Sequence, residues 1–182
     1  MSLRSTVILT LLAAVVGIIV YVNPFANEED KSGPPLWFYQ VEVDDMESIA
    51  IDFRGNQIGF VKTELGGWSF VEPSAITPDP RRWGGVVWLL GGPQTRRDLS
   101  ETGIIVENPA EYGLDDPDMV VTLGLTVDRS LEFRLGNYTT DGRHHYAQVV
   151  GFPELFLIAS SWGDIFSRLV TEPPYPKWYI KR

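Results

Sequence analysis

The chain has 182 residues, a formal net charge of −9 and no cysteine. The missing cysteine excludes disulfides, thiolate metal ligands and a thiol nucleophile. The acidic balance argues against a nucleic acid partner, because lysine and arginine carry phosphate binding. Seventeen glycines and thirteen prolines, with six tryptophans, seven tyrosines and nine phenylalanines, are typical of a turn-rich sheet protein.

The N-terminal segment carries the strongest signal in the sequence. Residues 6–22 are apolar throughout, with Arg4 before them and acidic residues at 28–30 after them. Such a run spans about 25 Å as a helix, close to the thickness of a bilayer core. We interpret residues 1–27 as a transmembrane signal anchor of the cytoplasmic membrane, embedded through residues 6–22, with the N-terminus cytoplasmic and the rest extracytoplasmic. The alternative is a cleaved secretory signal, which has the same basic start and apolar core.

A linker and an aromatic segment follow. Residues 28–35 are polar and contain glycine and proline, which predicts an irregular linker. Residues 36–43, LWFYQVEV, predict a strand, with the alternative that Trp37 and Tyr39 rest among lipid headgroups. These two side chains are therefore candidate contacts with a partner or the membrane. We expect residues 36–171 to form one α+β domain.

Alternating apolar and polar residues predict antiparallel hairpins in both parts of this domain. The first part contains expected strands at 48–53, 57–64 and 68–71, with turns at Gly55-Asn56 and Gly66-Gly67. The second part contains expected strands at 119–127, 131–136 and 145–150, with turns at 128–129 and 141–142.

Two short helices are expected to cover the sheet. Asp79-Pro80 predicts the start of the first helix, and Ser161 with Asp164 resembles an acidic capping box at the second. Their apolar faces consist of Trp83, Val86, Val87 and Leu90 in the first and Trp162, Ile165, Phe166 and Leu169 in the second. The shared Trp-Gly pair suggests a pseudo-repeat of two halves, 36–93 and 94–171; the alternative is coincidence.

A short motif lies between the two halves. Residues 111–117 read EYGLDDP, and they precede an expected strand and Leu135-Gly136. Together with the Gly67-Trp68 turn, this run resembles an uncharacterised bacterial domain family with a Tyr-Gly-Leu-acid-x-Pro motif. The resemblance covers about residues 48–170. It implies a location, because that family occurs in membrane-anchored proteins, often encoded near gliding-motility-type ABC transporter auxiliary proteins. This short single copy lacks a transporter-like partner domain.

The motif residues have a structural interpretation. Asn108-Pro109 is expected to open a helical turn that Gly113 ends in a left-handed conformation, with Leu114 tucked behind it. The motif positions to which we assign structural roles are Trp68, Tyr112, Gly113, Leu114 and Pro117. Calcium binding by the aspartates at 115, 116 and 118 is the alternative, but the loop lacks EF-hand spacing.

The remaining polar residues do not form a recognisable catalytic pattern. His144 and His145 are adjacent, so in a strand they point to opposite faces and cannot share a metal. The serines at 160 and 161 lack a nucleophile-elbow sequence, and no glycine run forms a phosphate cradle. We therefore predict no enzyme activity, no metal and no cofactor, with an exported hydrolase as the alternative.

The C-terminal segment 172–182, EPPYPKWYIKR, is expected to be extended because of its prolines. Its apolar side chains are candidate partner or membrane contacts, and these are Tyr175, Trp178, Tyr179 and Ile180. The alternative is that they pack on the parent domain.

These observations favour a non-catalytic accessory or structural subunit of a bacterial membrane protein complex. Such a protein presents an extracytoplasmic interaction domain on a single-pass anchor and contacts other membrane subunits. An extracytoplasmic ligand-binding or assembly factor for exported components is the alternative function.

Overall fold

The computed structural model describes residues 36–95 and 106–179. The expected anchor, the linker at 28–35 and Ile180 lie outside these residues. None of the helices in the described ranges has the length and apolar character needed to cross a membrane.

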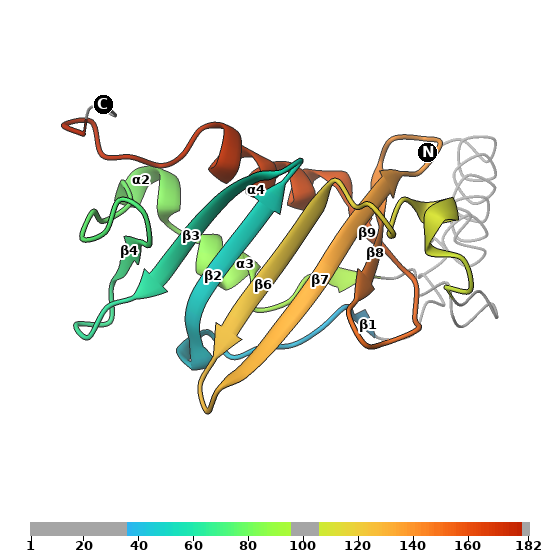
Figure 1. Cartoon of the computed structure of the whole chain (residues 1–182), viewed down its shortest axis with the longest axis horizontal. Coiled ribbons are helices and arrows are strands. Elements are labelled where there is room, and N and C mark those ends of the chain that lie inside the picture. Colours follow the sequence, from blue (N-terminus) through green and yellow to red (C-terminus); the bar gives the residue numbers. More distant parts are fainter. Residues whose placement is uncertain (1–35, 96–105, 180–182) are drawn as a thin grey trace, which may run out of the picture. The chain divides into compact units, whose positions relative to one another are not determined.

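The described part is an α+β domain built on one antiparallel sheet, as the sequence predicts. Seven strands form the sheet in the order β4-β3-β2-β6-β7-β8-β9 (Figure 1). Their bounds are β2 (Met46–Phe53), β3 (Asn56–Lys62), β4 (Trp68–Phe70), β6 (Met119–Leu125), β7 (Arg129–Tyr138), β8 (His144–Val149) and β9 (Phe156–Ala159). A separate two-stranded ladder joins β1 (Leu36–Trp37) to β5 (Gln94–Thr95).

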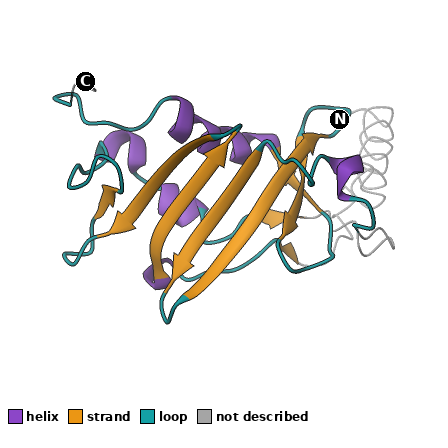
Figure 2. Cartoon of the chain, viewed as in Figure 1, coloured by secondary structure: helices purple, strands orange, loops and turns teal. Residues whose placement is uncertain are grey.

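The helices are few and short (Figure 2). They are α2 (Pro80–Trp83), α3 (Val86–Leu89) and α4 (Ser160–Thr171), with 3₁₀ turns at Val43–Asp45 and Pro109–Tyr112. Figure 1 shows the helices behind the sheet, while no helix crosses in front of β2, β6 and β7. The sheet therefore has one covered face and one open face.

Alternation along the strands produces the covered face. Ile49 and Ile51 of β2 are buried, whereas Ala50 between them is exposed. Phe133 of β7 and Phe166 of α4 are fully buried in the same cluster. Because side chains alternate between faces, one register places alternate residues of each strand, most of them apolar, against the helices.

The hairpins occur where alternation predicts them, with small shifts. The β2–β3 turn lies at Arg54-Gly55, one residue before the predicted pair, because Phe53 pairs with Asn56. Both turn residues have positive φ, 51° and 77°, as a two-residue hairpin turn with the sheet's twist requires. The β6–β7 loop contains Thr126 to Asp128 and therefore begins before the predicted turn.

Three predictions about local structure are wrong. Residues 36–43 are a strand only at Leu36–Trp37. The first helix is broken in two, because Gly84 has an extended ψ of 124° and Gly85 is left-handed with a φ of 88°. The second helix has Ala159 as its N-cap and no side-chain cap, so Ser161 and Asp164 do not form a capping box. Strand β9, which immediately precedes α4, was not predicted.

Candidate interaction surfaces and a buried histidine

The C-terminal segment is fastened to the domain at β4 and α2. The Tyr175 ring packs on Phe70 with 4.7 Å between centroids. The Asp79 backbone N–H donates a hydrogen bond of 2.8 Å to the Pro174 carbonyl. Arg82 donates to the Pro173 carbonyl at 2.9 Å and also to the Glu172 carbonyl. Backbone contacts of this kind hold an extended proline-rich segment in one path.

Of the candidate contact residues that the structure describes, Trp178 is the most exposed, with 71% of its surface accessible. Its neighbour Tyr179 packs against Tyr175, with ring centroids 4.7 Å apart, and lies edge-on to Trp178 at 6.4 Å. The segment that carries Trp178 is thus held by its preceding residues, while the indole itself faces solvent. An indole presented in this way resembles the aromatic anchors of protein interfaces.

The two aromatic candidates near the start of the domain differ. Trp37 is 41% exposed in β1. Tyr39 is buried in the core and stacks on Phe133 at 5.1 Å, so it offers no surface to a partner. Burial raises the pKa of Tyr39 far above its usual range. Its hydroxyl has no hydrogen-bond partner in the described structure.

The motif residues build a structural corner. Gly113 is left-handed with a φ of 67° and ends the 3₁₀ turn, and Leu114 is fully buried, as predicted. The Tyr112 ring packs on Tyr146 at 5.1 Å. A Cβ on Gly136 would lie 2.1 Å from the Tyr112 carbonyl oxygen, so the turn and the strand β7 approach too closely for any other residue.

The other two motif residues are placed apart from this corner. Trp68 lies in β4 and packs on Trp83, with centroids 6.0 Å apart. Pro117 borders a surface hollow of about 490 Å³ beside Arg54 and Asp118. Across the described residues, no three His, Asp or Glu side chains are grouped closely enough to hold a metal ion.

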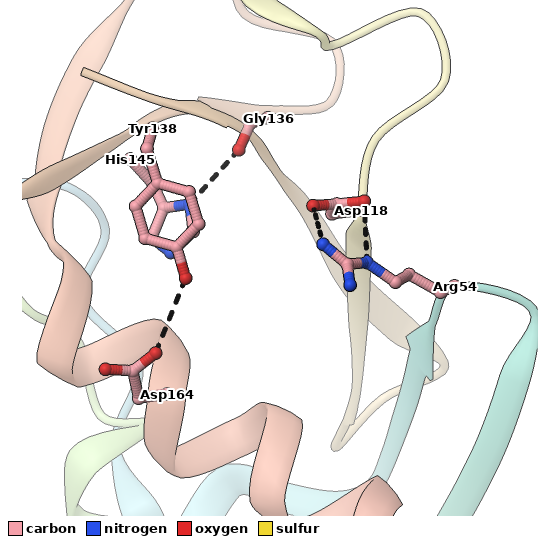
Figure 3. A network of polar contacts seen from close by, with 6 residues as sticks. All are labelled: Arg54, Asp118, Gly136, Tyr138, His145 and Asp164. Atoms are coloured by element: carbon pink, nitrogen blue, oxygen red, sulfur yellow. Dashed lines mark hydrogen bonds and ion pairs between the residues drawn. The ribbon is translucent and has the colours of Figure 1, made fainter. Parts of the chain in front are cut away.

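A polar network joins the sheet to α4 at one end of the strands (Figure 3). Arg54 forms a bidentate pair with Asp118, with hydrogen bonds of 3.0 and 2.8 Å. This guanidinium lowers the pKa of Asp118. Across the gap, the Tyr138 hydroxyl donates a long hydrogen bond of 3.5 Å to Asp164 of α4. Burial, followed by the charge of Asp164, raises the pKa of Tyr138.

His145 lies beside Tyr138 in this network (Figure 3). Its ring packs against the Tyr138 ring at a tilt of 38°, with centroids 4.0 Å apart, and Nδ1 lies 3.1 Å from the Gly136 carbonyl oxygen. That carbonyl can only accept, so Nδ1 carries the proton and Nε2 is bare in the neutral ring. Burial lowers the pKa of His145, which is only partly offset by the Gly136 hydrogen bond.

The bare nitrogen faces the backbone of α4. A Cβ built on Gly163 would lie only 2.9 Å from His145 Nε2. The adjoining cavity measures about 30 Å³. This histidine therefore packs the helix onto the sheet. His144, on the opposite side of β8, is half-buried, which agrees with the predicted alternation.

The open face of the sheet contains a hollow of about 710 Å³. Its floor is formed by outward-facing residues of β2, β3 and β6, and Val71 and Glu72 lie at its border. The floor residues are small or uncharged apart from Asp52, namely Ser48, Ala50, Asp52, Gln57, Gly59, Val120 and Thr122. A hollow this broad and shallow suits another surface better than a small molecule, which prefers an enclosed pocket.

Comparison of the chain with protein-family models, with curated proteins and with solved structures finds no match. The resemblance drawn from the tyrosine-glycine-leucine motif stays a prediction.

Sequence reasoning did not identify the polar network or the open face. Arg54 and Asp118 are 64 residues apart, and only the pairing of β2 with β6 brings them together. The open face had a signal in the sequence, because strands with glycine, alanine and serine at alternate positions are unusual for a solvated sheet surface.

Proposed function

We propose that this protein is a non-catalytic accessory subunit of a bacterial membrane protein complex, with residues 36–171 as its extracytoplasmic interaction domain. In this proposal, residues 1–27 anchor the chain in the cytoplasmic membrane through the apolar run 6–22. The antiparallel domain then stands outside the cytoplasm on the linker 28–35 and contacts neighbouring subunits.

The exposed indole of Trp178 carries this proposal. Its segment is fixed by the Arg82 and Asp79 hydrogen bonds and by the packing of Tyr175 on Phe70. A side chain that is already ordered loses little conformational entropy on binding. Burial of one large aromatic anchor of this kind contributes strongly to an interface.

The buried histidine supports a structural rather than a catalytic role. The hydrogen bond to Gly136 fixes its tautomer, and Nε2 is directed at the α4 backbone near Gly163. A general base must reach the proton that it removes. His145 in this position stabilises the packing of α4 on the sheet.

The proposal includes an internal repeat and membership of a protein family. Strands β2, β3 and β4 come from the first half and β6 to β9 from the second, and they meet at the antiparallel β2–β6 pair. This order suits a pseudo-two-fold repeat of halves 36–93 and 94–171. Membership of the membrane-anchored family with the tyrosine-glycine-leucine motif would agree with the anchored location.

The test is purification of the tagged full-length chain from native membranes in a mild detergent, followed by mass spectrometry. We expect companion membrane proteins in stoichiometric amounts. Trp178→Ala should lower their recovery about tenfold, since an interface anchor contributes 1.4 kcal/mol or more, roughly tenfold in affinity. Leu65→Ala is the control, because Leu65 is an exposed aliphatic side chain in the β3–β4 turn and presents no aromatic anchor.

A point substitution is sharper than removal of the C-terminal segment. Deletion from Pro173 onward would also expose Phe70 and remove the Pro173 carbonyl that accepts a hydrogen bond from Arg82. A lone, folded monomer recovered from native membranes would refute the subunit proposal. If that monomer contained a molecule in the hollow of the open face, the alternative ligand-binding function would replace it.

A further inference from the structure

The open face of the sheet has an ordered pattern of side chains. Strand pairing places five outward-facing residues in one row across β3, β2, β6, β7 and β8, and the row reads Gln57, Asp52, Val120, Arg134, Gln148. Val120 is the midpoint, an acid and a base flank it, and a glutamine stands at each end. Neighbouring strands are about 4.8 Å apart, so each charge lies about 5 Å to one side of Val120.

This row is complementary to its own rotated copy. A two-fold axis that runs along β6 through Val120, in the plane of contact, exchanges the two sides of the row. Asp52 of one copy then faces Arg134 of the other, and Arg134 faces Asp52. The same rotation places Gln57 opposite Gln148, where two amides can pair, and Val120 opposite itself. A self-complementary patch of this kind is the requirement for a closed dimer.

The shape of the face follows the same symmetry. The side over β2 and β3 is hollow, with Ala50 and Gly59 as its floor. The side over β7 and β8 carries the larger side chains of Glu132 and Arg134, and beyond them the Tyr112 ring packs on Tyr146. The axis along β6 places each larger half over the hollow of the other copy. An axis across the strands would instead place Asp52 on Asp52, so the strand-parallel axis is favoured.

The charged residues keep local partners that leave them facing outward. Asp52 accepts hydrogen bonds of 2.9 Å from the Gly55 backbone and the Gln57 amide. Arg134 lies 3.7 Å from Glu132 and donates a 3.4 Å hydrogen bond to the Leu114 carbonyl. These contacts hold both side chains in place, which lowers the conformational-entropy cost of association.

We propose that the open face binds a second copy of this chain, in a two-fold dimer that packs sheet against sheet. The contact is five strands wide, at about 4.8 Å per strand, and about seven residues long, at about 3.3 Å per residue along a strand. These dimensions give an area of roughly 550 Å² per copy. The total of about 1,100 Å² is at the lower end for a specific interface. Tethering on a membrane raises the effective concentration, and therefore a modest interface suffices.

The symmetry also agrees with the anchored topology, a point that depends on the proposed function. A rotation about an axis along the strands keeps every residue at the same height along that axis. Both copies of Leu36, where the described domain begins, thus lie at the same end of the dimer. Both anchors can enter one bilayer.

A charge-exchange experiment on the full-length chain tests the dimer. Two copies with different tags are co-expressed, solubilised in mild detergent and purified through one tag. We expect wild type to retain wild type. When both tagged copies carry Asp52→Arg, or both carry Arg134→Asp, the purified copy should retain about tenfold less of the other copy. Each of these pairs places like charges at two symmetric contacts. Asp52→Arg co-expressed with Arg134→Asp should restore recovery, since both contacts are then opposite in sign.

Two further measurements keep the test independent of folding. Thermal unfolding of each variant shows whether the turn after Asp52 tolerates arginine. Restored recovery of the mixed pair shows independently that both variants are folded. The chain has no cysteine, so Val120→Cys introduces a single thiol on the axis, which a short bismaleimide should join to its copy. Leu65→Cys, at a position 98% exposed in the β3–β4 turn, should not cross-link.

The outcomes separate this proposal from the proposed function. Wild-type copies that do not retain each other, or a mixed pair that recovers no better than the single variants, would overturn the dimer. If other membrane proteins still co-purify in that case, the accessory-subunit proposal stands without it. A dimer that is recovered without any companion protein would support the proposed dimer and refute the proposed accessory-subunit function.

Discussion

Substitution of Gly163 by alanine tests the packing of α4 on the sheet. In an ordinary helix interior, this change stabilises a protein by about 0.5–1 kcal/mol, because alanine has the higher helix propensity. Here the new Cβ would lie 2.9 Å from Nε2 and 3.0 Å from Cδ2 of His145, and 3.2 Å from a methyl group of Leu135. The helix and the sheet must therefore move apart, or the imidazole must move.

The imidazole cannot move freely. His145 is 6% exposed, and its displacement breaks the 3.1 Å hydrogen bond to Gly136. Overpacking of a core costs about 1–3 kcal/mol, and a lost hydrogen bond about 1 kcal/mol. After subtraction of the propensity gain, we expect Gly163→Ala to lower the free energy of unfolding by about 1–3 kcal/mol.

A double-mutant cycle isolates the clash. In a His145→Ala background the ring is absent, and Gly163→Ala should then be neutral or stabilising by up to about 1 kcal/mol. The assay is urea unfolding of the full-length chain in mild detergent, followed by near-ultraviolet circular dichroism. Gly163→Ala that is as stable as the wild type, with no coupling to His145, would refute the packing described for α4.

Three further predictions concern the same domain. Burial lowers the pKa of His145 below its ordinary value of 6.5, so the folded state takes up fewer protons than the unfolded state. Stability should therefore be constant above about pH 6.5 and fall as the pH drops below it. In His145→Gln, the melting temperature should depend less on pH between pH 7.5 and 5. Gly136→Ala should cost about 3 kcal/mol or more, since its Cβ would meet backbone at 2.1 Å, whereas Gly142→Ala, in open space at a φ of 69°, should cost only about 1 kcal/mol in urea unfolding. Phe166→Ala should lower the free energy of unfolding by about 3–5 kcal/mol, because this side chain is fully buried. Ile165→Ala on the same helix should lower it by under about 1.5 kcal/mol, because that side chain is 37% exposed. Equal losses of stability would contradict the helix face that packs on the sheet.

The strands that were predicted correctly share one property. In β2, β3, β6, β7 and β8, apolar residues alternate with small or polar ones, because one face is covered and the other open. Alternation is a local signal, so the sequence alone reveals it. Strand β9 has the run FLIA and continues directly into α4. A short apolar run without alternation does not distinguish a strand from a helix.

Predictions failed where the decisive contact comes from a distant part of the chain. Tyr39 looks like a surface aromatic within residues 36–43, yet Phe133 of β7 covers it. Gly84-Gly85 sits within an apolar pattern of helical period, but the left-handed Gly85 breaks the helix while Val86 still reaches the core. The polar network around His145 depends on the pairing of β2 with β6. Sheet order is a property of the whole fold, and one sequence does not show it.

The short strand β4 limits how copies of this chain can associate. β4 pairs with β3 at only three positions, from Trp68 to Phe70. A short edge strand is a poor template for another strand, so edge-to-edge growth into fibres is disfavoured. An edge of this kind directs encounters between copies away from open-ended polymers and toward assemblies that stop at a fixed size.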